Sequence, residues 1–155
     1  GERHDDSFDL ITRTLQKIGE ITTVEISIES SGRHNYGSIG PDKTPVVTLP
    51  GDPIAAYISF ELLIRPMIRT MLGTANIHRP SVKAKLEKAL TSSGGYRSYV
   101  RAILSADGKS VAPLASQDEQ ATLSDANCFI AVPEGETQLA AGAEVTVVVL
   151  ERRYL

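Results

Sequence analysis

Apolar residues in the first third of the chain follow two different periods. They recur at helical spacing over residues 7–18, directly before Gly19, which predicts one amphipathic helix. Apolar and polar positions then alternate over residues 20–29, and residues 45–49 form a short β-branched run, so both segments are predicted strands. The segment 30–43 between them contains several glycines and has no period, which indicates an exposed loop or a hairpin.

A long apolar helix is predicted after the tight turn formed by the sequence Pro-Gly-Asp-Pro. Asp52 can accept hydrogen bonds from the first amides of this helix, and Pro53 suits the first helical position because its φ is fixed. The helix runs to Leu72 and should kink near Pro66, which lacks a backbone donor. Apolar residues cover most of its circumference, so we expect it to be largely buried. Three charged residues spaced four apart form one narrow stripe that should face water: Glu61, Arg65 and Arg69.

The chain changes character at a polar stretch that contains Pro80. Beyond it come short runs rich in valine, isoleucine, leucine and alanine, separated by turns with glycine, which is typical of a small antiparallel barrel or sandwich. The first run could equally form a short helix. The runs occupy residues 81–90, 96–105, 109–114, 127–132 and 143–150.

Composition and charge exclude several functional classes. The 155 residues include 16 Lys and Arg and 19 Asp and Glu. The resulting net charge of -3 gives no electrostatic basis for binding nucleic acid or an anionic membrane. The single cysteine, Cys128, lies in an apolar run, which favours a buried core residue over a nucleophile and indicates a reducing compartment. No apolar run approaches the roughly 18 residues of a membrane-spanning helix, and the charged start does not resemble a signal peptide. We therefore expect a cytoplasmic protein with no membrane insertion.

Polar residues at two helix starts are candidate ligand sites. The turn before Pro53 places backbone amides at a helix N-terminus, where an anion can bind, although Asp52 can occupy the same amides as a simple cap. Asp5, Asp6 and Asp9 could bind a divalent cation, or could merely complement the dipole of the first helix.

Arginines supply the other candidates. Arg33 and His34 in the glycine-bearing segment can meet an anion or a partner, whereas simple solvation of a loop would also explain them. Arg97, Tyr99 and Arg101 alternate along a predicted strand and therefore share one face. That face is either an anion site or the solvated side of a sheet.

Residues 46–73 resemble the most recognisable segment of the molybdopterin molybdenumtransferase (MoeA) and gephyrin E-domain family. In that family a strand enters a Leu-Pro-Gly-Asn-Pro turn and then a long helix with an internal proline and a terminal glycine. Residues 19–29 also resemble the strand before the family's lysine-bearing loop, and residues 99–104 and 126–150 resemble its C-terminal β-barrel.

The resemblance implies a C-terminal fragment of the family fold. Residues 1–76 would be the second half of a molybdopterin-binding α/β domain, incomplete without its upstream part, and residues 77–155 would be a small all-β barrel domain. The expected fold class is therefore an α/β fragment followed by a barrel. Members of the family are usually dimers, which implies a homodimer that covers otherwise unpaired strand edges.

The resemblance further implies the family's reaction, in which molybdate is inserted into adenylylated molybdopterin with release of AMP and the help of Mg²⁺. Asp9 aligns with the aspartate of the metal and phosphate site, which makes it the candidate catalytic residue and metal ligand. Substrate binding is expected from the turn, the glycine-bearing segment and the barrel: Arg33, His34, Pro50, Gly51, Asp52, Pro53 and Arg101.

The loop that carries two lysines in the family has neither of them here. The aligned residues are 29–33, beginning with Glu29, and the loss of two charged hydrogen bonds worth about 1.5–3 kcal/mol each would weaken oxyanion binding strongly. Two functions therefore stay open. One is a transferase of molybdenum cofactor biosynthesis whose anion contacts have moved to Arg33, His34 and Arg101. The other is a catalytically inactive, gephyrin-like dimeric scaffold that binds a peptide of a membrane-receptor or cytoskeletal-type partner.

Overall fold

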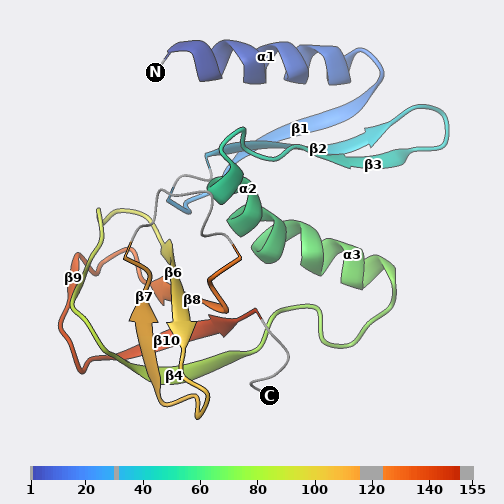
Figure 1. The fold of residues 1–155 in the computed structure, drawn as a ribbon. Coiled ribbons are helices and arrows are strands. Elements are labelled where there is room, and N and C mark those ends of the chain that lie inside the picture. Colours follow the sequence, from blue (N-terminus) through green and yellow to red (C-terminus); the bar gives the residue numbers. More distant parts are fainter. Residues whose placement is uncertain (1, 30–31, 116–123, 151–155) are drawn as a thin grey trace.

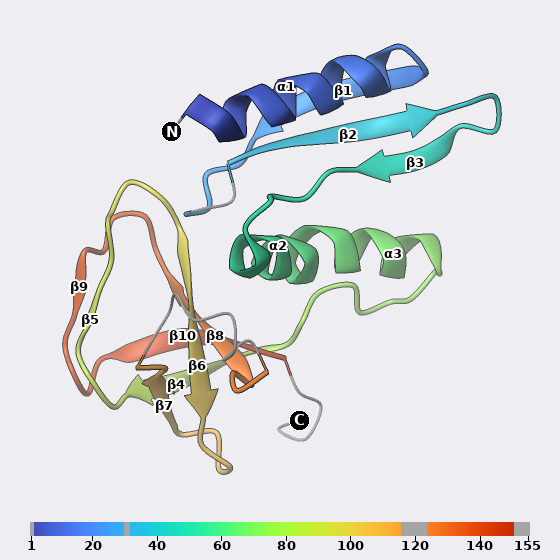
Figure 2. The same ribbon diagram turned by 45° about the horizontal axis from the view of Figure 1, so that its top comes forward.

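The computed structural model of the chain describes residues 2–29, 32–115 and 124–150, with side chains from Ser7 onward. Its first part stacks a helix, a three-stranded antiparallel sheet and a second helical segment in that order (Figures 1 and 2). The elements are α1 (Glu2–Gln16), β1 (Gly19–Glu25), β2 (Arg33–Ile39), β3 (Thr44–Val47), α2 (Pro53–Ser59), a π-helical turn η1 (Phe60–Ile64) and α3 (Arg65–Met71). The predicted first helix and the two predicted strands are confirmed.

Strand β2 lies where the sequence pattern predicted a loop or hairpin. It pairs along its whole length with β1, and its second half pairs with β3. The pattern concealed it because its buried positions are polar: His34 and Asn35 are 2% and 0% exposed. Asn35 donates to the Thr12 hydroxyl of α1 and accepts from the Thr23 hydroxyl of β1, so hydrogen bonds replace apolar packing between helix and sheet.

The long helix after the turn is one continuous helical segment with a widened turn in its middle. Asp52 caps it as predicted, because its Oδ1 accepts a hydrogen bond of 2.8 Å from the amide of Ala55. In η1 the amide of Arg65 donates to the carbonyl of Phe60, five residues back, immediately before Pro66. The predicted disturbance at Pro66 is therefore present, and it takes the form of a π-helical turn rather than a break.

The charged stripe of this helix is only partly exposed, whereas its spacing predicted a stripe that faces water. The chain that leaves α3 returns along the stripe, and its carbonyls accept hydrogen bonds from Arg65, at Ile77, and from Arg69, at Asn76. Glu61 is 6% exposed. The exposed side of α3 is instead apolar, with Met71 70% and Leu72 75% exposed. The returning chain thus covers part of the stripe that was predicted to face water, and α3 exposes apolar side chains that were predicted to be buried.

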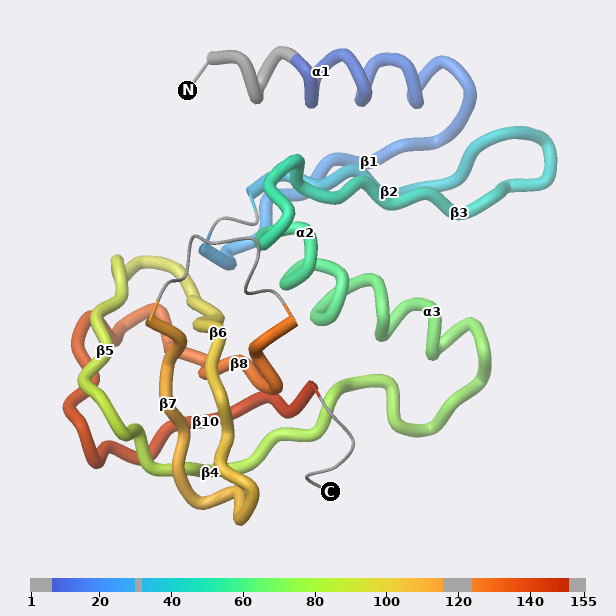
Figure 3. The backbone as a smooth tube through the Cα atoms, in the orientation of Figure 1, coloured from blue at the N-terminus to red at the C-terminus, as the bar shows by residue number. Residues whose placement is uncertain are grey.

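The second part of the chain is a closed five-stranded barrel (Figure 3), as the apolar runs predicted. All neighbouring strands are antiparallel except β4 and β7, and the first run forms a strand rather than a helix. A two-stranded ribbon of β5 (Leu90–Thr91) and β9 (Gln138–Leu139) extends from it. Around the barrel the order is β10 (Glu144–Val149), β4 (Ser81–Leu86), β7 (Ser110–Pro113), β6 (Ser98–Leu104) and β8 (Cys128–Val132).

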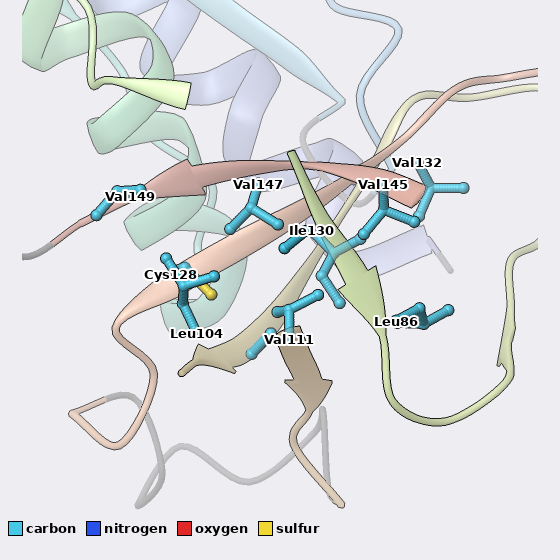
Figure 4. Close-up of a cluster of buried hydrophobic side chains, with 11 residues drawn as sticks. Leu86, Leu104, Val111, Cys128, Ile130, Val132, Val145, Val147 and Val149 are labelled. Carbon is cyan, nitrogen blue, oxygen red and sulfur yellow. The ribbon is translucent and has the colours of Figure 1, made fainter. Parts of the chain in front are cut away.

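Aliphatic side chains from all five strands fill the barrel (Figure 4). Strand β8 is buried on both faces, which explains why its sequence reads as an unbroken apolar run. Cys128, Ile130 and Val132 belong to the cluster inside the barrel, whereas Phe129 between them belongs to a second cluster outside it, against α2. The outer face of β8 therefore joins the barrel to the helical segment.

Cys128 is expected to be inert toward thiol reagents in the folded protein. Its side chain is fully buried, and burial raises the pKa of the Cys128 thiol to about 12. Titration with Ellman's reagent at pH 8 should therefore give no release of chromophore from the native chain and one equivalent in urea. Because the pKa of the thiol is raised on folding, its contribution to the free energy of unfolding is fully present below pH 9.0. This contribution is lost as the pH rises toward 12, because the thiol of the unfolded chain then ionises while that of the folded chain does not. Rapid native-state labelling at pH 8 would contradict the buried placement.

Candidate functional site

A cavity of about 520 Å³ lies where the helical segment meets the barrel. The start of α2 and the turn before it form one wall, with Asp52, Ile54 and Ala55 among the lining residues. Strand β6 forms the opposite wall through Tyr99 and Arg101. Glu29, from the segment that follows β1, lies at its side. Among the described residues, the lining combines an apolar surface with two carboxylates and one guanidinium, and these residues come from three distant parts of the sequence.

Main-chain hydrogen bonds attach the segment after β1 to the barrel beside this cavity. Ile28 and Arg97 form an isolated parallel bridge, in which the amide of Glu29 donates to the carbonyl of Arg97 at 3.0 Å. The amide of Arg97 donates in turn to the carbonyl of Ser27 at 3.2 Å. The hydroxyl of Ser93 donates to the Glu29 carboxylate. These contacts hold Glu29 against the barrel.

An aromatic cluster packs α2 against the barrel under the cavity. Phe129 is fully buried and meets the rings of Tyr57 and Tyr99 edge-on, at centroid distances of 5.7 and 6.4 Å. Edge-to-face pairs of this kind add about 0.5–1.5 kcal/mol beyond the area that they bury. Ile58 and Val148 complete the contact between helix and barrel. This packed interface adjoins the cavity, because Ile58 and Tyr99 belong to both.

Arg101 is the predicted site residue that the structure places most clearly at the cavity. It is fully buried in β6, opposite Phe129 of β8, and it lines the cavity. The solvated reading of this strand face is therefore wrong for Arg101. Arg97, by contrast, directly precedes β6, is exposed and does not line the cavity. A guanidinium in the wall of a cavity is a set of planar hydrogen-bond donors with a fixed positive charge.

The turn residues divide into one that lines the cavity and three that shape the chain around it. Asp52 lines the cavity while its carboxylate caps α2, so the capping interpretation is confirmed. Pro50, Gly51 and Pro53 belong to the same turn and are not among the lining residues. Pro50, Gly51 and Pro53 shape the backbone of the turn, which places Asp52 at the edge of the cavity.

Asp9 and Arg33 come together, but away from the cavity. The Arg33 guanidinium lies 3.3 Å from Asp9 Oδ1 and 4.5 Å above the ring of Phe8, so it rests on α1. His34 is buried, with its Nδ1 2.9 Å from the carbonyl of Thr48, and the prediction that it lies in an exposed loop is wrong. None of these three polar residues is in the lining of the cavity.

The described residues contain neither a metal-ligand cluster nor a membrane-spanning helix. Among them no three His, Cys, Asp or Glu side chains gather in a way that could hold a metal ion. Asp9 supplies one carboxylate, already paired with Arg33, and the side chains of Asp5 and Asp6 lie outside the described residues. No helix in the described part of the chain is long and apolar enough to cross a membrane.

Sequence reasoning missed the ion pair between Glu61 and Arg79. Arg79 donates from Nε and a terminal nitrogen to the two oxygens of the Glu61 carboxylate, at 2.7 and 3.0 Å. Arg65, one turn further along the helix, makes a longer ion pair with the same carboxylate, with its Nε 3.9 Å from Glu61 Oε2. No local signal marks a partner that lies in a different segment.

Comparisons with known proteins agree on one family. The family model of the MoeA C-terminal region (domain IV) matches residues 83–150. Molybdopterin molybdenumtransferase 1 of Mycobacterium tuberculosis is 33% identical over 149 residues, which cover 90% of this chain and 35% of that protein. Molybdopterin molybdenumtransferase 2 of the same organism is 40% identical over 107 residues, 67% of this chain and 26% of that protein.

A solved structure supports the same relationship. The molybdopterin biosynthesis MoeA protein from Pyrococcus horikosii superposes with a TM-score of 0.76 at 26% identity, over 92% of this chain and 35% of that one. The chain therefore spans about a third of the length of these relatives. The similarity extends beyond the barrel to the sheet and helices. Its sequence and its fold together show that the chain is MoeA-like, with a MoeA C-terminal region (domain IV) at residues 83–150.

Proposed function

We propose that this chain takes part in molybdenum cofactor biosynthesis by binding adenylylated molybdopterin and molybdate in the cavity between α2 and the barrel. One observation carries the proposal: a fully buried arginine, Arg101, lines a cavity of about 520 Å³ in a chain similar to molybdopterin molybdenumtransferases. A guanidinium offers a planar set of donors that matches phosphate and other oxyanions, and its charge-assisted hydrogen bonds are stronger than neutral ones.

The other lining residues suit the remaining parts of such a ligand. Ile54 and Ala55 on one wall and Tyr99 on the other provide apolar surface for a flat ring system. The carboxylates of Glu29 and Asp52 are acceptors for the amino and ring N–H groups of a pterin. In this arrangement Arg101 orients the anionic end of the ligand, and the carboxylates orient the pterin.

The finer family features belong to the same proposal. Residues 1–76 would be part of a molybdopterin-binding α/β domain, residues 77–155 the barrel domain, and the working protein a cytoplasmic homodimer. Mg²⁺ would assist the transferase reaction, but Asp9 is the one carboxylate that the described residues offer at its expected site. We therefore assign no step to the metal. Transferase activity is also part of the proposal. Its support is the similarity to proteins named molybdopterin molybdenumtransferase, of which this chain spans 35% or less.

A gephyrin-like scaffold is a second candidate, favoured by a different cavity. A space of about 370 Å³ beside the first is lined by Glu25, Glu29, Ile28 and Tyr96, among others. Two carboxylates and a half-exposed tyrosine suit a basic side chain of a partner peptide better than an anion. By the family resemblance, Glu29 also aligns with a lysine of the family's loop.

Calorimetric titration with adenylylated molybdopterin separates the two candidates. The folded chain should bind this ligand saturably, and addition of molybdate or Mg²⁺ should change the measured affinity. Inorganic phosphate at high concentration should compete, because it occupies the same arginine. A folded chain that gives no heat with the ligand, with or without Mg²⁺ and molybdate, would contradict the proposal and leave the scaffold function.

A further inference from the structure

Arg79 joins three segments of the chain through one guanidinium. Its Nε donates to one oxygen of Glu61, and one terminal nitrogen donates to the other. The second terminal nitrogen donates to the carbonyl of Leu150 at 2.7 Å. Glu61 lies in η1, Arg79 lies in the connection to the barrel, and Leu150 directly follows β10. The planar guanidinium therefore fixes the direction as well as the distance between helix and barrel.

The surroundings make this contact stronger than a surface ion pair. Glu61 is 6% exposed and the Arg79 side chain 21%, so solvent screens them little. Hydrogen bonding to Glu61 raises the pKa of Arg79, opposing the effect of burial. On the barrel side, the amide of Leu150 donates to the carbonyl of Asn127, and the amide of Val149 donates to Pro80. Both ends of the contact are thus anchored in hydrogen-bonded structure.

The apolar interface alone does not determine how α2 sits on the barrel. The cluster of Ile58, Phe129 and Val148 is held by the hydrophobic effect, which has no direction and allows small sliding motions. The same helical segment carries Glu61 and, nine residues earlier, the cavity residue Asp52. A shift at η1 is therefore transmitted along the helix to the wall that faces Arg101.

We propose that Arg79 is a positioning residue, which holds α2 against the barrel so that Asp52 and Arg101 face one cavity. Arg79 is not among the residues that line this cavity, so it acts through Glu61 and the Leu150 carbonyl. The expected effect of Arg79 on ligand affinity rests on the proposed function. The expected effect of Arg79 on the relative position of the two walls is independent of that function.

Distances between spin labels test the positioning directly. One label is placed on the exposed side of α3 at Met67→Cys and the other on the barrel at Lys88→Cys, both exposed, while Cys128 stays buried. The variants are Arg79→Gln, which removes the charge, and Arg79→Lys, which keeps the charge but cannot form the planar contact. The matched control is Arg69→Gln, because Arg69 also joins the helix to a carbonyl, at Asn76, but does not reach the barrel.

Both Arg79 variants should broaden or shift the distance distribution, whereas Arg69→Gln should leave it as in the parent. Affinity for adenylylated molybdopterin should fall roughly tenfold in both, because displaced walls no longer present their groups together. Arg79→Lys should remain folded by circular dichroism, so its result counts even where Arg79→Gln unfolds. An unchanged distance distribution in folded Arg79→Lys would overturn the inference. If the parent does not bind the ligand while the distances change, the proposed function fails and the positioning role stands.

Discussion

Replacing Phe129 with alanine is expected to lower the free energy of unfolding by about 3–5 kcal/mol. The side chain is fully buried between β8 and α2 and contacts Tyr57 and Tyr99 edge-on. Its removal leaves a cavity at the joint between the two parts of the molecule, where strands on one side and a helix on the other cannot easily collapse. The loss should appear in urea unfolding, followed by circular dichroism, as a lower midpoint.

A matched control separates this effect from a general loss of apolar side chains on the barrel. Ile103 lies on β6 and is 46% exposed, so Ile103→Ala should cost less than about 1 kcal/mol. Phe129→Leu should recover part of the stability, because it refills some of the volume. Equal midpoints for Phe129→Ala and the parent would show that α2 does not pack on the barrel as described.

Replacing Arg101 with glutamine is expected to weaken binding of adenylylated molybdopterin by about 10- to 100-fold, as follows from 1.5–3 kcal/mol for charged hydrogen bonds. Arg101 is the cationic residue in the lining of the cavity, and burial limits the screening of its charge. Arg101→Lys keeps the charge without the paired donors and should give an intermediate affinity. Calorimetric titration measures each variant.

Arg97→Gln is the control for this second prediction. Arg97 belongs to the same stretch of chain but is exposed and outside the cavity lining, so its loss should leave the affinity unchanged. Thermal melts of all variants show whether a weaker affinity comes from the loss of a ligand contact or from unfolding of the chain. If folded Arg101→Gln binds as tightly as the parent, the guanidinium does not hold the ligand.

The barrel strands and the start of α2 could be predicted from the sequence because the local pattern agrees with the structure there, whereas the exposed side of α3 could not. Each barrel strand is a short apolar run between turns, and α2 begins at a capped turn with Asp52 and Pro53. Strand β2 could not be predicted, since His34 and Asn35 are buried polar residues that hydrogen bonds satisfy. Periodicity detects apolar burial, and it does not detect a strand whose buried side is polar.

The candidate site was predictable only in part. Arg101 and Asp52 were identified by their chemistry, and both line the cavity. Their meeting depends on tertiary contacts that no local pattern encodes, such as the hydrogen bonds of Arg79 to partners 18 and 71 residues away. The family resemblance pointed to Arg33 as well, but in the structure its guanidinium contacts Asp9 and the ring of Phe8.

A crystal structure of the chain with adenylylated molybdopterin would show whether the cavity holds this ligand. We expect the ligand in the cavity between α2 and β6, with its phosphate oxygens within hydrogen-bonding distance of the Arg101 guanidinium and its pterin near Glu29 or Asp52. A ligand bound on another surface, or an empty cavity in crystals that hold the ligand elsewhere, would contradict it.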